Sequence, residues 1–212
     1  MTQPAKGWPS RRRAVWLAVF LACLIPFASL VWRFFTDDLG ADPVETLIRS
    51  TGDWGIRFII GGLMITPLRQ MGWNAPARFR RMIGLYAFFY VCLHLTTYLV
   101  VDQGLDMPSI VGDILKRPYI TIGMLAFVLL IPLAATSTAA MVRRLGGKRW
   151  IMLHRLVYAI GVLAVIHYYL LVKSDVTWPI IYGAILALGL AWRLKEKLRR
   201  QRQIFRTGTA RP

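Results

Sequence analysis

Acidic residues are scarce in this chain. Its 212 residues include 10 Asp and Glu against 27 Lys and Arg, which gives a formal net charge of +17. Such an excess of positive charge is typical of proteins that bind nucleic acid or a membrane surface. A nucleic-acid-binding protein carries its basic residues on a folded soluble face, and no polar segment here is long enough to form one. We therefore expect a lipid bilayer as the partner and no nucleic acid.

Cysteine and histidine are rare as well. The two cysteines, Cys23 and Cys92, lie in apolar runs and are interpreted as small buried hydrophobic residues. The three histidines are His94, His154 and His167. The chain has no internal repeat of fixed period and no low-complexity segment, which excludes repeat architectures.

Long apolar runs fill most of the chain, of which 56% is hydrophobic. They alternate with loops that are acidic and basic in turn, the pattern of a multi-span membrane protein whose basic loops stay in the cytoplasm. We predict an all-α fold, a polytopic bundle of six transmembrane helices with both termini inside. The predicted spans are residues 14–35, 54–68, 82–101, 119–138, 151–172 and 179–194.

The loops define the predicted organisation: a cytoplasmic basic arm over 1–13, a transmembrane domain over 14–194 and a cytoplasmic basic tail over 195–212. The first apolar run could be a cleaved signal peptide, but it is longer than a signal core and no Ala-x-Ala site follows it. We expect a retained span. The outer loops are 36–53, 102–117 and 173–178, and the inner loops are 69–81 and 139–149.

Polar residues and prolines interrupt some of these spans. The second span is the weakest, because its Arg57 must snorkel to an interface or pair with another group. Pro26 is expected to kink the first span. Pro132 interrupts the fourth span, where the hydroxyl groups of residues 136–138 can bond to backbone groups that it frees.

All three histidines lie within predicted spans, where an imidazole without a partner is costly and is a candidate functional residue. Counted from the inner side, His94 lies about 18 Å deep, His167 about 24 Å and His154 about 5 Å, at about 1.5 Å per helical residue. Helix tilt and boundary errors can close the gap between the first two. The sequence therefore predicts that His94 and His167 face each other in the outer half of the membrane.

Two facing neutral imidazoles in an apolar bundle indicate a heme site, with His94 and His167 as axial ligands of the iron. Zinc would need four ligands, and too few Cys, Asp or Glu lie at that depth. The absence of Cys-x-x-Cys-His excludes covalent attachment of a c-type heme. The alternative is that each histidine hydrogen-bonds a neighbouring carbonyl or hydroxyl group, for instance of Thr96, Thr97 or Tyr169.

His154 has no partner at its own depth. It lies beside Arg155 and one turn before Tyr158, where it could ligate a second heme, contact a quinone or hold a flavin phosphate together with arginines. Alternatively, its ring merely bonds a loop carbonyl group. The preceding Gly146-Gly147-Lys148 could offer N–H groups to a phosphate, or simply form a turn. On a straight helix His154 and His167 would be about 140° and about 20 Å apart, so they cannot share one porphyrin.

Several motifs resemble those of a known family. They are Arg80-Arg81-Met-Ile-Gly84-Leu-Tyr-Ala-Phe88 with Tyr90 and His94, Arg117-Pro-Tyr-Ile-Thr121, Pro132-Leu-Ala-Ala-Thr-Ser137, and Trp150-x-x-Leu-His154-Arg-Leu-x-Tyr158 with His167. Together they cover nearly the whole chain and are similar to those of the MsrQ family, the heme-binding membrane subunits of the bacterial methionine sulfoxide reductase system. That family belongs to the ferric reductase and NADPH oxidase transmembrane superfamily.

The resemblance implies a multi-pass protein of the bacterial inner membrane that binds heme b and FMN and takes electrons from a membrane quinone. It also implies a periplasmic partner, the molybdopterin-containing subunit MsrP, which reduces methionine sulfoxide in oxidised periplasmic proteins. The chain would then be an electron-transfer subunit rather than the catalytic subunit, with no catalytic residue of its own.

One position departs from the wider superfamily. NADPH oxidases carry a second histidine in the equivalent of the third span, and here the position 14 residues before His94 is Arg80. A second heme of that type would lack a ligand. The chain also ends soon after the sixth span without a Gly-x-Gly-x-x-Gly motif, so we expect it not to bind NAD(P)H.

Two other functions stay open. One is a ferric or cytochrome b561-like heme reductase without a dedicated partner, and the other is a small transporter or membrane scaffold in which the histidines relay protons. The transporter is disfavoured because no intramembrane carboxylate accompanies the histidines. An absorption spectrum separates these classes, because only the heme proteins have a Soret band.

Overall fold

The computed structural model describes residues 10–208, with side chains over 11–203. Within that range the chain contains no strand, so the predicted all-α class is confirmed. The long helices are α1 Ser10–Phe35, α2 Pro43–Gln70, α3 Arg80–Thr96, α5 Pro118–Ala135, α8 Leu156–Leu171 and α9 Thr177–Gly208. The shorter ones are a 3₁₀ helix Ala75–Phe79, a π-helix Thr97–Asp102, α4 Met107–Lys116, α6 Ala139–Leu145 and α7 Gly147–His154.

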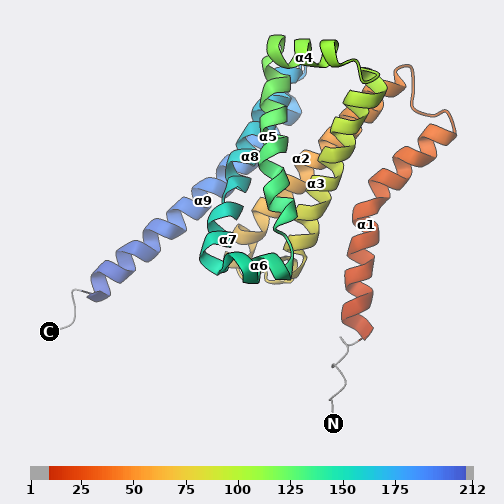
Figure 1. The fold of residues 1–212 in the computed structure, drawn as a ribbon. Helices are drawn as coiled ribbons and strands as arrows, with labels where there is room; N and C mark the ends of the chain where they lie inside the picture. The colour runs from red at the N-terminus through yellow and green to blue at the C-terminus, as the bar shows by residue number, and fades with distance from the viewer. Residues whose placement is uncertain (1–9, 209–212) are drawn as a thin grey trace.

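The centre of the molecule is a bundle of α2, α3, α5 and α8 (Figure 1). Its closest helix pairs are α2 with α3 and α5 with α8. α1 lies at one side of the bundle, and α9 packs on α2 and α8 before its last turns extend away. α4 crosses one end of the bundle, and α6 and α7 lie at the opposite end.

Five helical segments of the described chain are long and apolar enough to cross a membrane: Arg11–Phe35, Ala75–Asp102, Pro118–Ala135, Gly147–Leu171 and Thr177–Gln203. The protein is therefore a multi-pass membrane protein. The predicted span over 54–68 lies in α2, which is 28 residues long but is not among the five. α2 tolerates its polar residues because it is central and turns apolar side chains such as Ile59 and Leu63 toward other helices. A sixth membrane helix stays a prediction.

The predicted outer loop over 36–53 is too long, since α2 already begins at Pro43. The Asp42 side chain accepts a hydrogen bond from the backbone N–H of Glu45 at 2.9 Å, and proline occupies the first helical position. Both are preferred at helix starts. The segment Asp42-Pro-Val-Glu45 therefore carried a helix-start signal that the hydropathy pattern hid.

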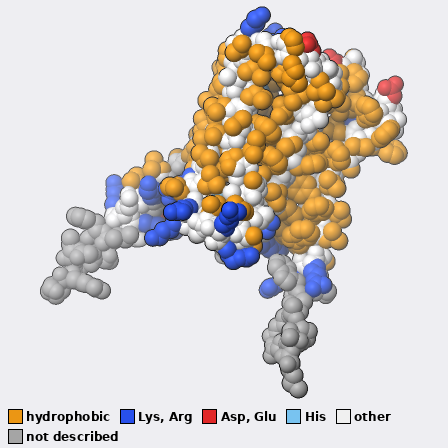
Figure 2. All heavy atoms as spheres, viewed as in Figure 1, with side chains coloured by type: hydrophobic (Ala, Val, Ile, Leu, Met, Phe, Trp, Pro, Cys, Tyr) orange, Lys and Arg blue, Asp and Glu red, His pale blue; other side chains and the backbone are white. Residues whose placement is uncertain are grey.

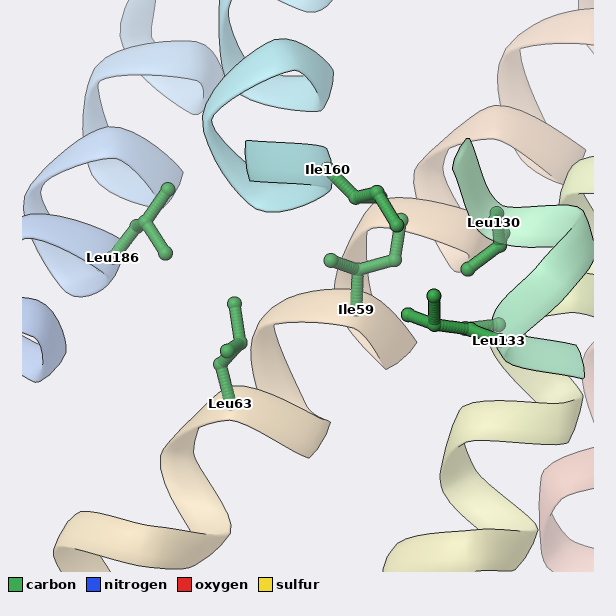
Figure 3. Close-up of a cluster of buried hydrophobic side chains, with 7 residues drawn as sticks. Ile59, Leu63, Leu130, Leu133, Ile160 and Leu186 are labelled. Atoms are coloured by element: carbon green, nitrogen blue, oxygen red, sulfur yellow. The ribbon is translucent and has the colours of Figure 1, made fainter. Parts of the chain in front are cut away.

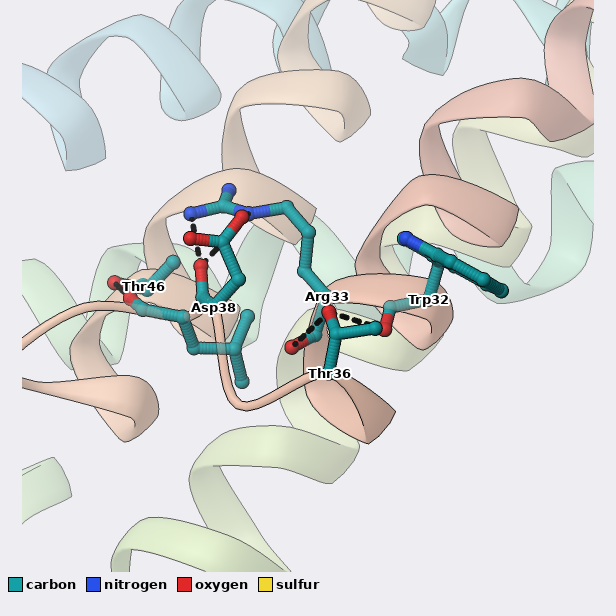
Figure 4. Close-up of polar contacts among 6 residues, drawn as sticks. Trp32, Arg33, Thr36, Asp38 and Thr46 are labelled. Carbon is teal, nitrogen blue, oxygen red and sulfur yellow. Dashed lines mark hydrogen bonds and ion pairs between the residues drawn. The ribbon is translucent and has the colours of Figure 1, made fainter.

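Side-chain bonds to backbone hold the short connection from α1 to α2 (Figure 4). Arg33 donates to the carbonyl oxygen of Asp38 through Nε at 3.0 Å and Nη2 at 2.8 Å. The Thr46 hydroxyl donates to the carbonyl oxygen of Leu39 at 2.9 Å. These contacts fix how α2 enters the bundle.

The span predicted over 151–172 lies in the membrane-capable segment Gly147–Leu171, but it is not one continuous α-helix. α7 ends at His154 and α8 begins at Leu156, with Arg155 between them. The backbone N–H of Arg155 bonds the carbonyl oxygen of Met152, and that of Tyr158 bonds the carbonyl oxygen of Arg155, which are tight i to i+3 contacts. The loop predicted over 102–117 contains α4, and the loop predicted over 139–149 contains α6 and the start of α7, with Gly146 between them.

Polar groups inside the helices find partners, although not in every case the expected ones. Arg57 lies 3.6 Å from the Asp53 carboxylate and donates to the Tyr182 hydroxyl at 2.9 Å, so it pairs. After Pro132, the hydroxyl groups of Thr136 and Ser137 donate to the carbonyl oxygens of Pro132 and Leu133, at 2.6 and 2.7 Å. The carbonyl group that Pro132 leaves without its helical donor is that of Val128, so the expected acceptor was wrong. Thr138 instead caps α6.

A cluster of buried apolar side chains joins α2, α3, α5, α8 and α9 (Figure 3). Its members are Ile59, Leu63, Ala87, Leu130, Leu133, Ile160 and Leu186. Ile59, Leu130 and Ile160 also line a large cavity on the side of the bundle that α4 covers. The cluster is thus the floor of that cavity and sets its depth.

Candidate heme site

His94 and His167 meet in the upper half of the bundle, at the end crossed by α4. His94 lies on α3 just before the π-helix, and His167 lies near the end of α8. Their ring centroids are 6.1 Å apart and the ring planes are inclined by 82°. The structure thus places side by side the two imidazoles that were matched in depth, while their role as ligands stays a prediction.

A backbone carbonyl group orients each of the two rings. His94 Nδ1 lies 2.9 Å from the carbonyl oxygen of Ile48 on α2, and His167 Nδ1 lies 2.6 Å from that of Tyr119 on α5. A carbonyl oxygen only accepts, so each Nδ1 carries a proton, and in the neutral ring the lone pair is then on Nε2. Neither Nε2 has a hydrogen-bond partner among the described residues, so each ring retains one nitrogen that can bind a metal.

Two glycines make room for these contacts. An added Cβ at Gly52 would lie 3.0 Å from His94 Nδ1, and one at Gly123 would lie 2.8 Å from His167 Nδ1. Each glycine follows its carbonyl residue, Ile48 or Tyr119, by four positions on the same helix. Each imidazole therefore packs against the same local arrangement, a backbone carbonyl group followed one turn later by a glycine.

A cavity of about 350 Å³ surrounds the two rings, within the range of about 300–1,000 Å³ for small-molecule sites. Its walls are mostly apolar, and polar and charged side chains lie among the lining groups: Arg49, Asp53, Tyr98, Asp102, Arg117, Tyr119 and Tyr168. An apolar interior with a few polar groups suits an amphipathic ligand.

The spacing of the rings fits an iron porphyrin. Two imidazoles on opposite sides of one metal, with bonds of about 2 Å as imidazole makes to zinc, would have centroids about 6.5 Å apart. The observed 6.1 Å is close to that separation. A tetrahedral metal site fits less well, because the described chain has no cluster of three or more His, Cys, Asp or Glu that could hold a metal ion.

His154 lies outside this cavity and has other contacts. Its Nε2 is 3.0 Å from the Thr136 hydroxyl oxygen, and its ring stacks on Trp150 with centroids 3.9 Å apart. The Thr136 hydroxyl proton is used toward the carbonyl oxygen of Pro132, so Nε2 donates to Thr136. His154 therefore forms a structural hydrogen bond, which was the alternative to a ligand role, but its partner is a hydroxyl group rather than a loop carbonyl group. The straight-helix angle between His154 and His167 no longer applies, because the helix is broken at Arg155.

Comparison with known proteins decides the family. Residues 51–165 match the family described as "Ferric reductase like transmembrane component". A relative from Rhodospirillum rubrum, named "Protein-methionine-sulfoxide reductase heme-binding subunit MsrQ", is 56% identical over 190 residues, 88% of this chain and 90% of the relative. A relative of the same name from Ralstonia nicotianae is 51% identical over 207 residues, 96% and 95% of the two chains.

The chain belongs to the MsrQ family. The resemblance drawn from the motifs is thereby confirmed, as is the localisation in the bacterial inner membrane. The segment that matches the ferric reductase family contains His94 and His154 and ends before His167. No solved structure matches the chain.

Sequence reasoning missed the four residues that orient the imidazoles: Ile48, Gly52, Tyr119 and Gly123. A glycine inside a helical pattern is a weak signal for close packing, and both glycines carry it. The carbonyl partners carry no side-chain signal at all. They could be found only once the helices were packed.

Proposed function

We propose that the protein is a transmembrane electron-transfer subunit that carries electrons from the quinone pool through heme b to a periplasmic molybdopterin-containing methionine sulfoxide reductase of the MsrP type. Its role is the repair of oxidised periplasmic proteins. The observation that carries the heme part is the facing pair His94 and His167, each with Nδ1 on a carbonyl oxygen and Nε2 free.

The residues have distinct tasks in this proposal. His94 and His167 would hold the iron through Nε2, because the hydrogen bond from each Nδ1–H to a backbone carbonyl oxygen selects the tautomer with its lone pair on Nε2. The apolar floor excludes water from the rings. Arg49 and Arg117 line the same cavity, and although they pair with Glu45 and Asp113, their remaining N–H groups could also donate to the carboxylates of a porphyrin. The heme itself would supply one-electron redox chemistry.

FMN is proposed as a second cofactor, and quinone as the donor, on the strength of the family alone. A ferric or cytochrome b561-like reductase without an MsrP-type partner is the second candidate. It uses the same heme site, so the cavity does not separate the two. Transfer of electrons from the reduced protein to a purified MsrP-type subunit does.

The first prediction tests the ligands. Replacing either His94 or His167 by alanine removes one Nε2 donor, so we expect the low-spin reduced-minus-oxidised heme spectrum to be lost or converted while the protein still inserts. His154→Ala is the matched control, because that ring lies outside the cavity, and it should retain the low-spin spectrum. Wild-type spectra for both His94→Ala and His167→Ala would refute the assignment.

A further inference from the structure

The opposite end of the bundle carries a group of cationic side chains that the heme site does not use. We call Arg80, Arg193, Arg69 and His154 the inner basic cluster. Arg80 on α3 has Arg193 of α9, Arg69 of α2 and Tyr158 of α8 as electrostatic neighbours, and His154 of α7 has Arg80. Four helices thus bring positive or protonatable groups to one place.

Several donors of this cluster are unused. Arg193 stacks over the Tyr158 ring, donates to the Tyr158 hydroxyl at 2.5 Å and donates to the carbonyl oxygen of Leu63. Its Nε is buried and has no hydrogen-bond partner among the described residues. Arg80 donates to the Thr66 hydroxyl at 3.3 Å and otherwise presents free N–H groups.

No carboxylate of the described side chains balances this charge. None of the ion pairs formed by the described side chains includes a member of the cluster. Elsewhere the chain does pair its arginines, as Arg57 with Asp53 and Arg117 with Asp113. Arg69 and Arg80 are exposed, whereas Arg193 is partly buried, and a partly buried cation without a counter-charge is costly. An anion bound from outside the protein would offset this cost.

We propose that the inner basic cluster is a binding site for the phosphate group of an anionic ligand, held by Arg80 and Arg193. Guanidinium groups match phosphate oxygens with paired, charge-assisted hydrogen bonds. Arg69 and Arg80 flank the connection from α2 to α3. This connection lies at the end of the bundle where Lys and Arg side chains gather on the visible face (Figure 2), so a ligand would reach the cluster from that end. This phosphate site rests on the proposed function and deepens it, because a phosphate site in a heme-binding subunit would serve a phosphorylated cofactor that carries electrons.

Two sources share this phosphate chemistry: a flavin nucleotide and an anionic phospholipid headgroup. The flavin arm measures binding of FMN to the heme-loaded protein in zwitterionic detergent by fluorescence quenching, with riboflavin, which lacks the phosphate, as the matched ligand. The lipid arm measures the rise in unfolding temperature on transfer from phosphatidylcholine to phosphatidylglycerol nanodiscs.

Arg80→Gln and Arg193→Gln are the test variants. Arg81→Gln is the control, because it removes the same charge one residue along α3. In the flavin arm we expect the affinity for FMN to fall about tenfold in Arg80→Gln and Arg193→Gln, or in the lipid arm we expect these variants to lose the rise in unfolding temperature. In either arm Arg81→Gln should respond like the wild type. FMN binding above riboflavin binding assigns the flavin, and a lipid response alone assigns the headgroup.

Wild-type responses of both test variants in both arms would overturn the phosphate site. The Soret band of each variant is recorded alongside as the check on folding. A normal Soret band with lost phosphate binding supports the site. Absence of heme from the wild-type protein would refute the proposed function, and the lipid arm, which reads an unfolding temperature and needs no heme, would still test the phosphate site.

Discussion

At the scale of single residues, backbone atoms and missing side chains orient the two imidazoles. Each ring hydrogen-bonds a carbonyl oxygen of a neighbouring helix and packs against a glycine one turn later on the same helix. A carbonyl group in an intact helix is fixed by the whole element, so it orients a ring more rigidly than a mobile side chain would. The position of His94 therefore depends on α2, and that of His167 on α5.

Gly52→Ala and Gly123→Ala test this dependence. The new methyl group would press on an imidazole that can swing away in the absence of heme but not while it is a ligand. We expect heme binding to weaken by about 1–3 kcal/mol, the usual cost of overpacking, with little change in the stability of the heme-free protein. Heme titration and thermal unfolding of each variant give both quantities.

Gly61→Ala is the matched control, since it lies on α2 and a Cβ there would meet no atom within 4 Å. It should bind heme like the wild type. Equal heme affinity in Gly52→Ala, Gly123→Ala and Gly61→Ala would show that the rings are not held by these contacts.

At the scale of elements, a side chain from α3 holds α1 against the bundle. The Tyr90 hydroxyl accepts from the backbone N–H of Phe27 at 3.0 Å and donates to the carbonyl oxygen of Cys23 at 2.9 Å. It thus occupies the place of the i to i−4 bond in α1, next to Pro26, which lacks an N–H group. Insertion of a side chain and a proline both bend helices, and α1 is bent in Figure 1.

Tyr90→Phe removes this bridge and leaves the Cys23 carbonyl and the Phe27 N–H groups to find each other or stay unpaired. We expect a loss of about 1–3 kcal/mol in stability, the range for unsatisfied buried polar groups, measured as a lower unfolding temperature in detergent. Tyr169→Phe is the control, because that ring is 51% exposed and its hydroxyl has no partner among the described residues. A shift no larger than that of the control would contradict the bridging role.

The elements also show what the sequence could and could not predict. Hydropathy located five membrane helices, and proline and hydroxyl residues marked where helices end. The hydropathy pattern misplaced the start of α2, because the apolar residues begin later than the helix does. It also missed the break at Arg155, because nothing in an apolar run signals a break. His94 and His167 could be paired from depth alone, whereas their partners in α2 and α5 depend on helix packing, which one sequence does not reveal.

At the scale of the whole molecule, basic and acidic side chains lie at opposite ends of the helical bundle. On the visible face most Lys and Arg side chains lie at the end formed by α6 and α7, and the Asp and Glu side chains lie at the opposite end (Figure 2). The heme candidates lie toward the acidic end and the inner basic cluster toward the basic end. Electrons entering at the basic end and leaving at the acidic end would follow the long axis of the bundle.

The final prediction is the orientation of this axis in the membrane. Basic loops remain in the cytoplasm, so α6 and the described end of α9 should lie inside and α4 outside. α9 has 32 residues, about 48 Å at about 1.5 Å per residue, against a hydrocarbon thickness of about 30 Å. Its last turns must therefore leave the bilayer, and their Lys195, Lys197 and Arg199 assign them to the cytoplasm.

Reporter fusions at Ile110 on α4 and at Arg144 on α6 measure the orientation directly, and a fusion at Gln203 measures it for α9. We expect a periplasmic signal at Ile110 and cytoplasmic signals at Arg144 and Gln203. The pair Ile110 and Arg144 is separated by α5 alone, so opposite signals follow whenever α5 spans the membrane, and the sign of the difference gives the orientation. A cytoplasmic signal at Ile110 would overturn both the six-span topology and the placement of the heme candidates in the outer half, because the end that α4 covers would then face the cell interior.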